Sequence, residues 1–228
     1  MQHLVVLTGA GISAESGIKT FRDQDGLWEN YDVMEVASYE GWLKNPGLVL
    51  QFYNERRKQL ELALPNAGHL GLVKLEKHFK VSIITQNVDN LHERAGSKNV
   101  LHLHGELTKA RSTKDSSSII NIGYKDINLG DKCPKGGQLR PHIVWFGEAV
   151  PAMDEAIEIA ARADIFVVIG TSLNVYPAAG LLDYAPPKVP IYLIDPNPIT
   201  SSIRRKYEFI NEKAGKGVEI ISNILLNN

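Results

Sequence analysis

Apolar residues recur along the chain in short, unbroken runs that end in glycine or polar residues. Five runs share this form and begin at His3, Val81, Ile165, Ile191 and Val218, with the letters HLVVLTG, VSIITQN, IFVVIGTS, IYLIDPN and VEIIS. Runs that are apolar throughout are typical of strands covered on both faces, as in a parallel sheet. Helical patterns separate several of them, as at 67–79 and 152–163. The pattern therefore predicts a doubly wound α/β sheet.

Two long stretches do not follow this alternation. Residues 20–64 are rich in aromatic side chains and take helical spacing toward their end, whereas residues 106–145 are largely polar. We expect the two insertions to build one smaller module beside the sheet. In a single domain of residues 1–228, the larger part then takes approximately 1–20, 65–105 and 146–228, and the smaller module takes 21–64 and 106–145.

The composition is that of a globular protein with almost no net charge. The 228 residues are 43% hydrophobic and carry a formal net charge of −1, which favours neither nucleic acid nor an anionic membrane as a partner. Cys133 is the only cysteine, which excludes an internal disulfide and points to a reducing compartment. The apolar stretch at 165–170 is too short to span a bilayer. We therefore expect a cytoplasmic protein that binds neither nucleic acid nor membranes.

A glycine loop follows the first apolar run. The letters GAGISA at 9–14 match G-x-G-x-x-G/A, in which glycines let the backbone approach a diphosphate. A dehydrogenase would continue with a helix, a second strand and an acidic residue about 20 positions later. The stretch FRDQDGLWENYDVMEV from Phe21 has acidic residues but no apolar run. The sequence therefore gives little support to a hydride-transferring dehydrogenase. Taken alone, the loop is also compatible with a tight turn that binds no ligand.

The carboxyl ends of other runs carry small or amide side chains. The segments read TQNVDNLHERAG at 85–96, GTSLNVYP at 170–177 and DPNP at 195–198. Ligands of open α/β sheets bind outside the carboxyl ends of the strands. Such groups can hydrogen-bond ribose hydroxyls, a carboxamide and phosphates, although QNVDN alone also fits a polar turn.

Five segments taken together resemble the sirtuin family of NAD-dependent protein lysine deacylases. They read GAGISAESGIKTFRD, TQNVDNLHERAG, LHLHGEL, RPHIVWFGE and VIGTSLNVYPAAGL, in that order over nearly the whole chain. The resemblance implies a Rossmann-like fold and an enzyme that consumes NAD as a co-substrate. The implied reaction removes the acyl group from an acyl-lysine of a protein or peptide and releases nicotinamide and O-acyl-ADP-ribose.

The resemblance also implies roles for single residues. His104 would be the catalytic base, which suits a side chain whose unperturbed pKa is about 6.5. On an extended segment, His102 would face the same side as His104. Phe21, Arg22 and Trp28 would belong to the loop that closes over the nicotinamide ribose. The implied NAD-binding residues are Gly9, Ala10, Gly11, Ser13, Ala14, Phe21, Arg22, Trp28, Gln86, Asn87, Asp89, Gly170, Thr171, Ser172, Asp195 and Ala214.

The substrate backbone is implied to pair with residues 142–148, HIVWFGE, as with an edge strand. The residues that would bind it are Val144, Trp145, Phe146 and Gly147. From the residues alone, an ordinary strand is the alternative.

The helical stretch that begins at Pro46 bears on the acyl group. At about 100° per residue, one stripe is formed by Val49, Phe52, Tyr53, Arg56 and Leu60. Lys58 points away from this stripe, and a solvated charged run fits Arg57 and Lys58 better than Arg56. An arginine on an apolar face should find an anion or snorkel out to solvent along its stem, and a phenol with a guanidinium makes a good carboxylate site.

The Tyr-x-x-Arg pair resembles that of the class III sirtuin branch, which removes succinyl, malonyl and glutaryl groups. That branch also has a small residue in the pocket, which Ala37 matches. We therefore expect succinyl-lysine or malonyl-lysine as the preferred substrate, with acetyl-lysine also accepted.

The second insertion departs from the family pattern of two Cys-x-x-Cys pairs that hold a structural zinc. The letters ARSTKD at 110–115 replace the first pair, and CPKGGQLRP keeps only Cys133. A closed structural site needs four ligands. We therefore predict a degenerate zinc ribbon that binds no metal.

Two other functions stay open from the sequence. Mono-ADP-ribosyl transfer shares the first bond cleavage, and product analysis by mass spectrometry separates it from deacylation. A non-catalytic module that binds NAD or ADP-ribose would need a broken site, whereas His104, Asn87 and Asp89 are all present.

Overall fold

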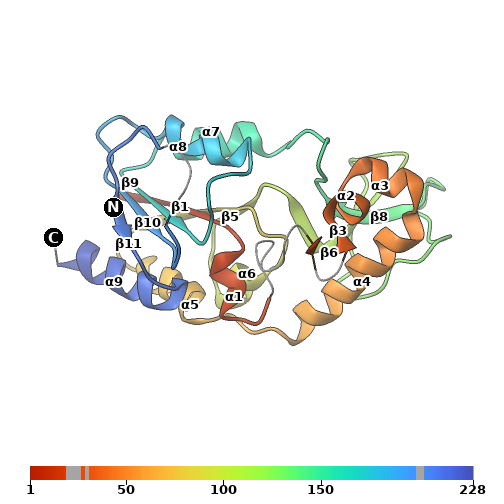
Figure 1. Cartoon of the computed structure of the whole chain (residues 1–228), viewed down its shortest axis with the longest axis horizontal. Helices are drawn as coiled ribbons and strands as arrows, with labels where there is room; N and C mark the ends of the chain where they lie inside the picture. The colour runs from red at the N-terminus through yellow and green to blue at the C-terminus, as the bar shows by residue number, and fades with distance from the viewer. Residues whose placement is uncertain (19–26, 29–30, 199–202, 228) are drawn as a thin grey trace.

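The computed structural model describes residues 1–18, 27–28, 31–198 and 203–227, of which 27–28 by their backbone only. Its larger lobe holds a six-stranded sheet in the order β11-β10-β9-β1-β4-β5, in which every neighbouring pair is parallel (Figure 1). The strands are β1 (His3–Thr8), β4 (Lys80–Thr85), β5 (Val100–His102), β9 (Ile165–Ile169), β10 (Ile191–Ile194) and β11 (Glu208–Ile210). The predicted parallel α/β sheet is thus confirmed.

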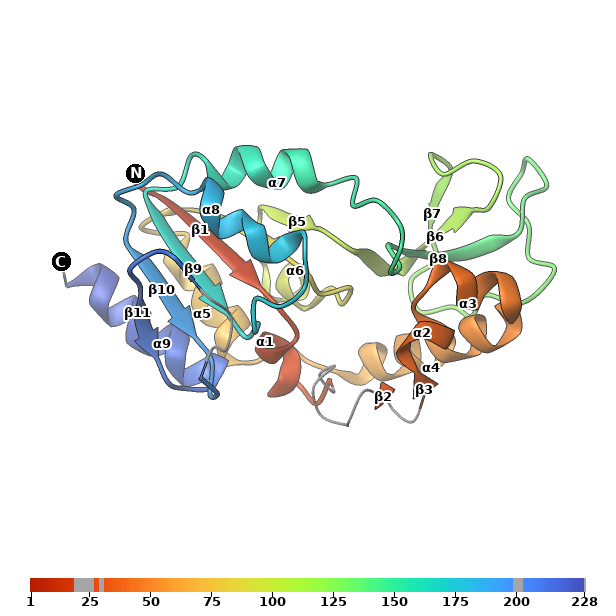
Figure 2. The ribbon, with the colours of Figure 1, turned by 45° about the horizontal axis from the view of Figure 1, so that its top comes forward.

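Both faces of this sheet are covered by helices, which explains why its strands are apolar throughout. Val5 and Leu7 of β1 belong to one hydrophobic cluster with α7 (Met153–Ala160) and α8 (Leu181–Tyr184). Leu4 and Val6 belong to a second cluster with α5 (Ala67–Leu75) and α9 (Ala214–Leu226). Figure 2 shows the two helix layers on opposite sides of the strands.

A smaller lobe lies beside the sheet and draws on two distant parts of the chain (Figure 1). Its antiparallel sheet has the order β7-β6-β8, and beside it pack three helices, with a further short pair of strands, β2 and β3. Phe52, Leu107 and Ile143 belong to one hydrophobic cluster, so the two insertions share a core. The elements are β2 (Leu27–Trp28), β3 (Tyr31–Asp32), α2 (Val33–Val36), α3 (Tyr39–Lys44), α4 (Pro46–Leu62), β6 (Gly105–Ser112), β7 (Ile119–Asn121) and β8 (Leu139–Ile143).

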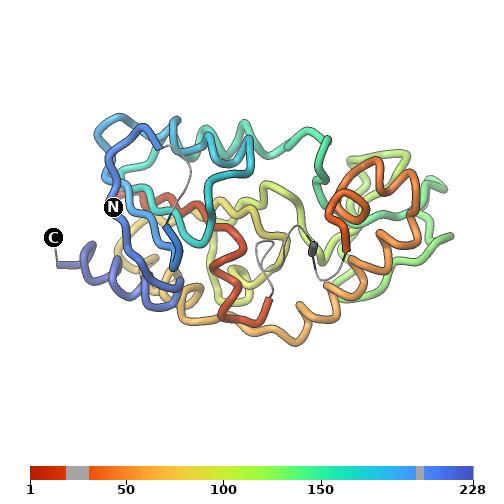
Figure 3. Tube along the Cα trace, in the orientation of Figure 1, coloured from red at the N-terminus to blue at the C-terminus, as the bar shows by residue number. Residues whose placement is uncertain are grey.

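The start of the long helix α4 is fixed by a capping residue and a proline in its first turn. The Asn45 side-chain oxygen accepts a hydrogen bond from Leu48 N at 3.1 Å, and Pro46 occupies the first turn, where no backbone N–H is needed. The remaining short elements are α1 (Gly11–Ala14), α6 (Leu91–Ala95) and the 3-10 turn η1 (Ala178–Gly180). Both the N-terminus and the end of α9 lie at the end of the molecule away from α4 (Figure 3).

The run VEIIS at Val218 is not a strand, and that prediction was wrong. The run lies inside α9, where the buried residues Ala214, Val218 and Ile221 recur every three or four positions. A β-branched run favours a strand locally, but burial of one helical face against the sheet outweighs that preference.

The edge strand predicted over 142–148 is only partly a strand. β8 lies at an edge of its sheet but ends at Ile143, and Gly147, with φ of +87°, helps the chain to turn. Between these points, Phe146 forms an isolated bridge with Ser38, and Phe146 N donates to Ala37 O at 2.9 Å. Val144 N still donates to His104 O at 2.9 Å, and beyond it the segment is held against 37–38 rather than continued in the sheet.

The second insertion is held by ordinary packing and hydrogen bonds around Cys133. The buried Cys133 thiol donates to Ser112 Oγ at 3.1 Å, and Cys133 N donates to Gly137 O at 2.8 Å. Among the described residues, no group of three or more His, Cys, Asp or Glu side chains is arranged to hold a metal ion. The absence of zinc stays a prediction. Within the same ranges, no helix is long and apolar enough to cross a membrane.

Candidate active site

A cavity of about 570 Å³ opens at the carboxyl ends of β1, β4, β9 and β10. Because β4 and β9 flank β1 on opposite sides, the connections that leave these strands diverge, and ligands of α/β sheets bind at such a point. Residues within 9–15, 86–89, 170–177 and 195–197 line the cavity from the sheet. Helix α4 and residues within 143–148 line it from the smaller lobe. The cavity therefore lies between the two lobes and has a volume typical of ligand sites.

The glycine loop packs so closely on the end of β9 that side chains do not fit there. Gly9 N donates to Ile169 O at 3.0 Å, and Gly11 N donates to Gly170 O at 2.9 Å. A Cβ on Gly11 would lie 2.6 Å from Gly170 Cα, and one on Gly170, whose φ is +65°, would lie 2.5 Å from Ile12 N. The glycines thus hold two loops together and leave bare backbone at the cavity wall.

Three buried polar side chains form a linked cluster on the wall. Ser13 Oγ donates to Asp89 Oδ2 at 2.9 Å, and Asn87 Nδ2 donates to Ser13 Oγ at 3.1 Å. Burial raises the pKa of Asp89, against hydrogen bonds from Leu91 N and Ser13 that lower it. The cluster fixes the two loops that follow β1 and β4 relative to each other.

His104 lines the cavity with one ring nitrogen held by the backbone. Its Nδ1 lies 3.0 Å from Gln86 O. Because a carbonyl oxygen only accepts, Nδ1 carries the proton, and Nε2 keeps its lone pair in the neutral ring. Burial lowers the pKa of His104, and the Gln86 hydrogen bond opposes this shift only in part. The ring is therefore neutral near pH 7 and able to accept a proton.

His102 supports the same backbone segment. Its Nδ1 lies 2.9 Å from Asn87 O, and its Nε2 lies 2.8 Å from Glu93 Oε1. Burial lowers the pKa of His102, but the adjacent Glu93 carboxylate, together with Asn87 O and Glu106, outweighs burial, and the pKa is raised overall. The two histidines thus reach the adjacent carbonyls of Gln86 and Asn87, as expected if both side chains face the same side.

Helix α4 presents Tyr53 and Arg56 to the cavity. They are 1% and 5% exposed, and the predicted stripe with Val49, Phe52 and Leu60 is buried throughout. The Arg56 guanidinium lies over the Phe52 ring, 5.6 Å from its centroid. The cavity side of α4 therefore combines an apolar surface with a phenol and a fixed positive charge.

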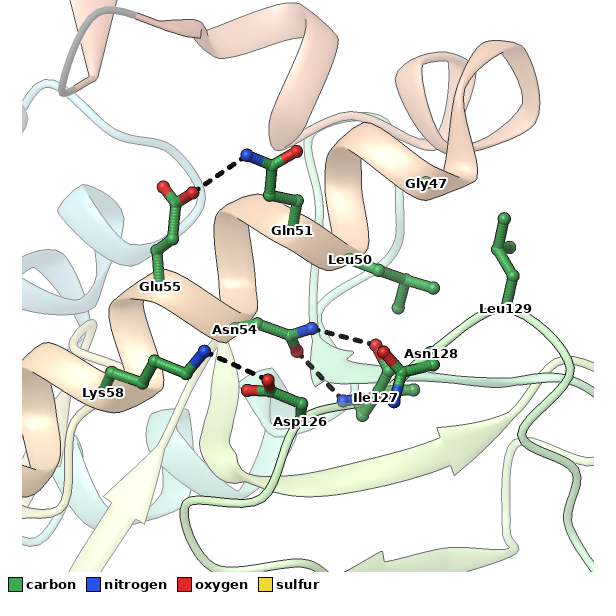
Figure 4. Close-up of a pocket in the computed structure, with 10 residues that line it drawn as sticks. All are labelled: Gly47, Leu50, Gln51, Asn54, Glu55, Lys58, Asp126, Ile127, Asn128 and Leu129. Carbon is green, nitrogen blue, oxygen red and sulfur yellow. Dashed lines mark hydrogen bonds and ion pairs between the residues drawn. The ribbon is translucent and has the colours of Figure 1, made fainter.

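The outer side of α4 lines a separate hollow of about 390 Å³, shown in Figure 4. Lys58 lies there and pairs with Asp126 at 3.1 Å, so it points away from the cavity as predicted. Asn54 binds both backbone groups of Ile127 at 3.0 Å. This hollow shares no lining residue with the cavity that contains His104.

Arg57 does not belong to a solvated charged run, and that expectation was wrong. Its exposed fraction is 0%, and its guanidinium donates to Asn54 Oδ1 and to Leu107 O. Burial lowers the pKa of Arg57 to about 10. A helix position beside the apolar stripe becomes buried when a second sheet packs on it, which the periodicity of one helix does not reveal.

Glu148 organises the segment that lines the smaller-lobe side of the cavity. Arg140 donates to both of its carboxylate oxygens, at 2.7 Å and 3.0 Å, and Arg111 donates to both at 2.9 Å and 3.0 Å. Trp145 N also donates to Glu148 Oε2 at 2.9 Å. Burial raises the pKa of Glu148, but the hydrogen bond from Arg140 and its other partners hold the pKa below its ordinary value.

The cavity gathers nearly every predicted site residue within the described part of the chain. Those lining it are Gly9, Ala10, Gly11, Ser13, Ala14, Ala37, Tyr53, Arg56, Gln86, Asn87, Asp89, His104, Val144, Trp145, Phe146, Gly147, Gly170, Thr171, Ser172 and Asp195. Ala214 does not line it, because its side chain is buried in the hydrophobic cluster that also contains Leu72, and the adjacent Lys213 lines the cavity instead. Phe21, Arg22 and the side chain of Trp28 lie outside the described residues.

Several lining residues were not singled out from the sequence. Tyr176 and Asn197 lie within the strand-end segments 170–177 and 195–198, and Glu148 ends HIVWFGE, so these motifs themselves signal the three positions. Glu15 lies within the segment GAGISAESGIKTFRD, whereas Lys213 lies in none of these segments. Their place follows from tertiary contact, since Glu15 Oε2 accepts a hydrogen bond from Gly215 N at 2.7 Å across the two helices.

Comparison with protein families finds a match to the Sir2 family over residues 9–177. A protein of Bacteroides thetaiotaomicron named NAD-dependent protein deacylase is 54% identical over 231 residues, covering 99% of each chain. A protein of Helicobacter pylori with the same name is 57% identical over 214 residues, covering 94% of this chain and 93% of its own.

Solved structures give the same relationship. A crystal structure of a Sir2 homologue with NAD superposes with a TM-score of 0.88 at 40% identity, covering 99% of this chain and 90% of that one. A Sir2 structure with a p53 peptide and NAD superposes with a TM-score of 0.79 at 29% identity, covering 99% of this chain and 94% of that one.

Proposed function

The chain belongs to the Sir2 family and is an NAD-dependent protein deacylase, and from this premise we propose that it preferentially removes acyl groups ending in a carboxylate, such as succinyl and malonyl, from lysine. Its substrates are acyl-lysine side chains of proteins or peptides. Acetyl-lysine is accepted less well, because it offers no carboxylate.

The sheet side of the cavity suits NAD. Gly9, Gly11 and Gly170 have no room for a Cβ against their own neighbours and line the cavity, so the wall there is bare backbone that a diphosphate can approach. The linked side chains of Ser13, Asn87 and Asp89 offer donors and acceptors for hydroxyl and carboxamide groups. When bound, NAD supplies the ribose carbon that receives the acyl oxygen and the nicotinamide that leaves.

His104 serves as the proton acceptor in this proposal. Gln86 O holds the Nδ1 proton, which leaves Nε2 to take up the proton of a ribose hydroxyl. Its lowered pKa supports the role, because the neutral ring is the form that accepts.

One observation carries the proposal for the acyl group, namely that Tyr53 and Arg56 line the same cavity as His104. Arg56 is 5% exposed, and a guanidinium in such surroundings is stabilised by a carboxylate, which it can bind with two parallel hydrogen bonds. Burial raises the pKa of Tyr53, so the phenol stays protonated and able to donate. Ala37 adds a small side chain on the same wall, which leaves room for a branched or extended acyl group.

Replacing Arg56 by methionine tests this proposal. We expect Arg56→Met to lower kcat/KM for a succinyl-lysine peptide about ten- to hundredfold, since hydrogen bonds to a charged group contribute about 1.5–3 kcal/mol. The value for the matching acetyl-lysine peptide should change far less. Both are measured by nicotinamide release under initial-rate conditions.

Lys58→Met is the matched control on the same helix. Lys58 faces the outer hollow and its ion pair is exposed, so its loss should leave the ratio of succinyl to acetyl turnover unchanged. An unchanged ratio in Arg56→Met would contradict the proposed preference.

A further inference from the structure

Trp145 is bonded directly to the proposed carboxylate ligand Tyr53. The indole Nε1 donates to the Tyr53 hydroxyl oxygen at 3.0 Å. Both residues are almost fully buried, at 2% and 1% exposed, and both line the cavity. The bond joins helix α4 to the segment that follows β8, although 92 positions separate the two residues in the chain.

This bond has a direction that the chemistry of the two groups fixes. An indole N–H only donates, whereas a phenol has one O–H to donate and oxygen lone pairs to accept. The Tyr53 oxygen therefore accepts from Trp145, and its own proton is left for another partner. A carboxylate, which only accepts, is complementary to a hydroxyl in that state.

Trp145 is itself held from two sides. The Arg140 guanidinium lies over its ring, 3.3 Å from the centroid, and donates to Glu148 at 2.7 Å and 3.0 Å. Glu148 Oε2 also accepts from Trp145 N at 2.9 Å. Ring and backbone are thus anchored to the same ion pair, so the direction of the indole N–H is set by packing and not by the substrate.

We propose that Trp145 is a positioning residue for acyl specificity, whose indole N–H holds the Tyr53 hydroxyl as a donor to the carboxylate of the acyl group. The proposal rests on the proposed function, since it assumes that Tyr53 faces an acidic acyl chain. It adds a residue that selects the acyl group through its contact with Tyr53.

The test is a double-mutant cycle of Trp145→Phe and Tyr53→Phe, read as the ratio of kcat/KM for succinyl-lysine to acetyl-lysine peptides. Trp145→Phe keeps an aromatic ring but removes the donor. We expect it to lower the ratio about three- to tenfold, mainly through a higher KM for the succinyl peptide. This factor corresponds to the loss of one neutral hydrogen bond. In the Tyr53→Phe background, Trp145→Phe should cause no further change in the ratio.

The outcomes separate the two proposals. A ratio unchanged by Tyr53→Phe overturns the assignment of Tyr53 to the carboxylate, and with it the premise. A lowered ratio in Tyr53→Phe but an unchanged ratio in Trp145→Phe overturns only the role of Trp145. Equal effects of Trp145→Phe in both backgrounds, or a fall in kcat for both peptides alike, indicate a merely structural role and also overturn it.

Arg140→Lys provides a second variant if Trp145→Phe does not fold, which thermal unfolding reports. Lysine keeps a positive charge beside Glu148 but removes the planar group that lies over the Trp145 ring. We expect the ratio to fall in the same direction by a smaller factor. An unchanged ratio in Arg140→Lys would then count against the proposal.

Discussion

At the scale of single residues, the proposed role of His104 as a proton acceptor depends on which ring nitrogen carries its proton. The Gln86 carbonyl selects Nδ1–H, and burial lowers the pKa of the ring, so the ring is neutral and keeps a lone pair on Nε2 before any substrate binds. A histidine on the surface would titrate near pH 6.5 and lose its lone pair in mild acid. One backbone hydrogen bond and one buried position thus set both the tautomer and the charge.

The pH profile of kcat/KM should reveal this state. Because the pKa of His104 is lowered, protonation of Nε2 should reduce activity only below about pH 6.5, and the acid limb should have its midpoint under that value. His104→Asn keeps a donor for Gln86 O and should lose about 10²- to 10⁴-fold in kcat/KM. NAD binding by the variant, measured by calorimetry, is the control. A midpoint above pH 6.5 or a loss below tenfold would contradict the assignment.

At the scale of elements, the site is built where loops from different strands interlock. The loop after β1 and the loop after β9 pack backbone to backbone, with Gly11 and Gly170 facing each other. Segments separated by more than 150 positions in the chain therefore form one wall. The close approach explains the need for glycine on both sides, a requirement that the G-x-G pattern displays on one side only.

Gly170→Ala should disrupt this contact. Its Cβ would lie 2.5 Å from Ile12 N, and φ of +65° is unfavourable for alanine, so we expect a loss of about 2–4 kcal/mol in the free energy of unfolding and weaker NAD binding. Denaturant unfolding measures the first and calorimetry the second. Gly180→Ala is the matched control, since its Cβ would meet nothing closer than 3.9 Å. Equal free energies of unfolding in the two variants would contradict the proposed close contact at Gly170.

At the scale of the whole molecule, two buried histidines join helices to the sheet. His69 of α5 and His92 of α6 have their ring centroids 4.8 Å apart, and His92 Nε2 lies 3.1 Å from Thr8 Oγ1 at the end of β1. Burial lowers the pKa of His69 to about 4 and lowers that of His92 as well. The folded protein therefore holds both rings neutral in mild acid.

Stability should fall as the pH falls. An unfolded histidine binds a proton below about pH 6.5, whereas folded His69 does so only near pH 4, so the unfolded state binds more protons between these values. We expect the free energy of unfolding to decrease across that window by up to about 3 kcal/mol for His69. His69→Gln removes this titration and should flatten the decrease, as followed by denaturant unfolding from pH 7 to pH 4. An equally steep decrease in the variant would refute the linkage.

The pattern of the sequence sufficed for the four central strands of the sheet and for most of the candidate site, because both lie in contiguous segments, but it did not predict the edge strands β5 and β11. Four apolar runs are parallel strands, and the polar residues that follow them meet at one edge, since parallel strands all end on the same side. Periodicity likewise placed Tyr53 and Arg56 on one face of α4. The helical state of Val218 and the burial of Arg57 could not be predicted from local periodicity, because each depends on what packs against α9 and α4.

The sequence by itself determined the four central strands, the glycine loop, the family resemblance and the residues available for chemistry, since local periodicity and spacing carry that information. Only the tertiary structure decided which of these residues touch. The bond from Trp145 to Tyr53 and the contact of Gly11 with Gly170 join positions far apart in the chain. Such contacts arise when helices and strands pack together, and the relative placement of these elements is set by the burial of all their apolar faces at once.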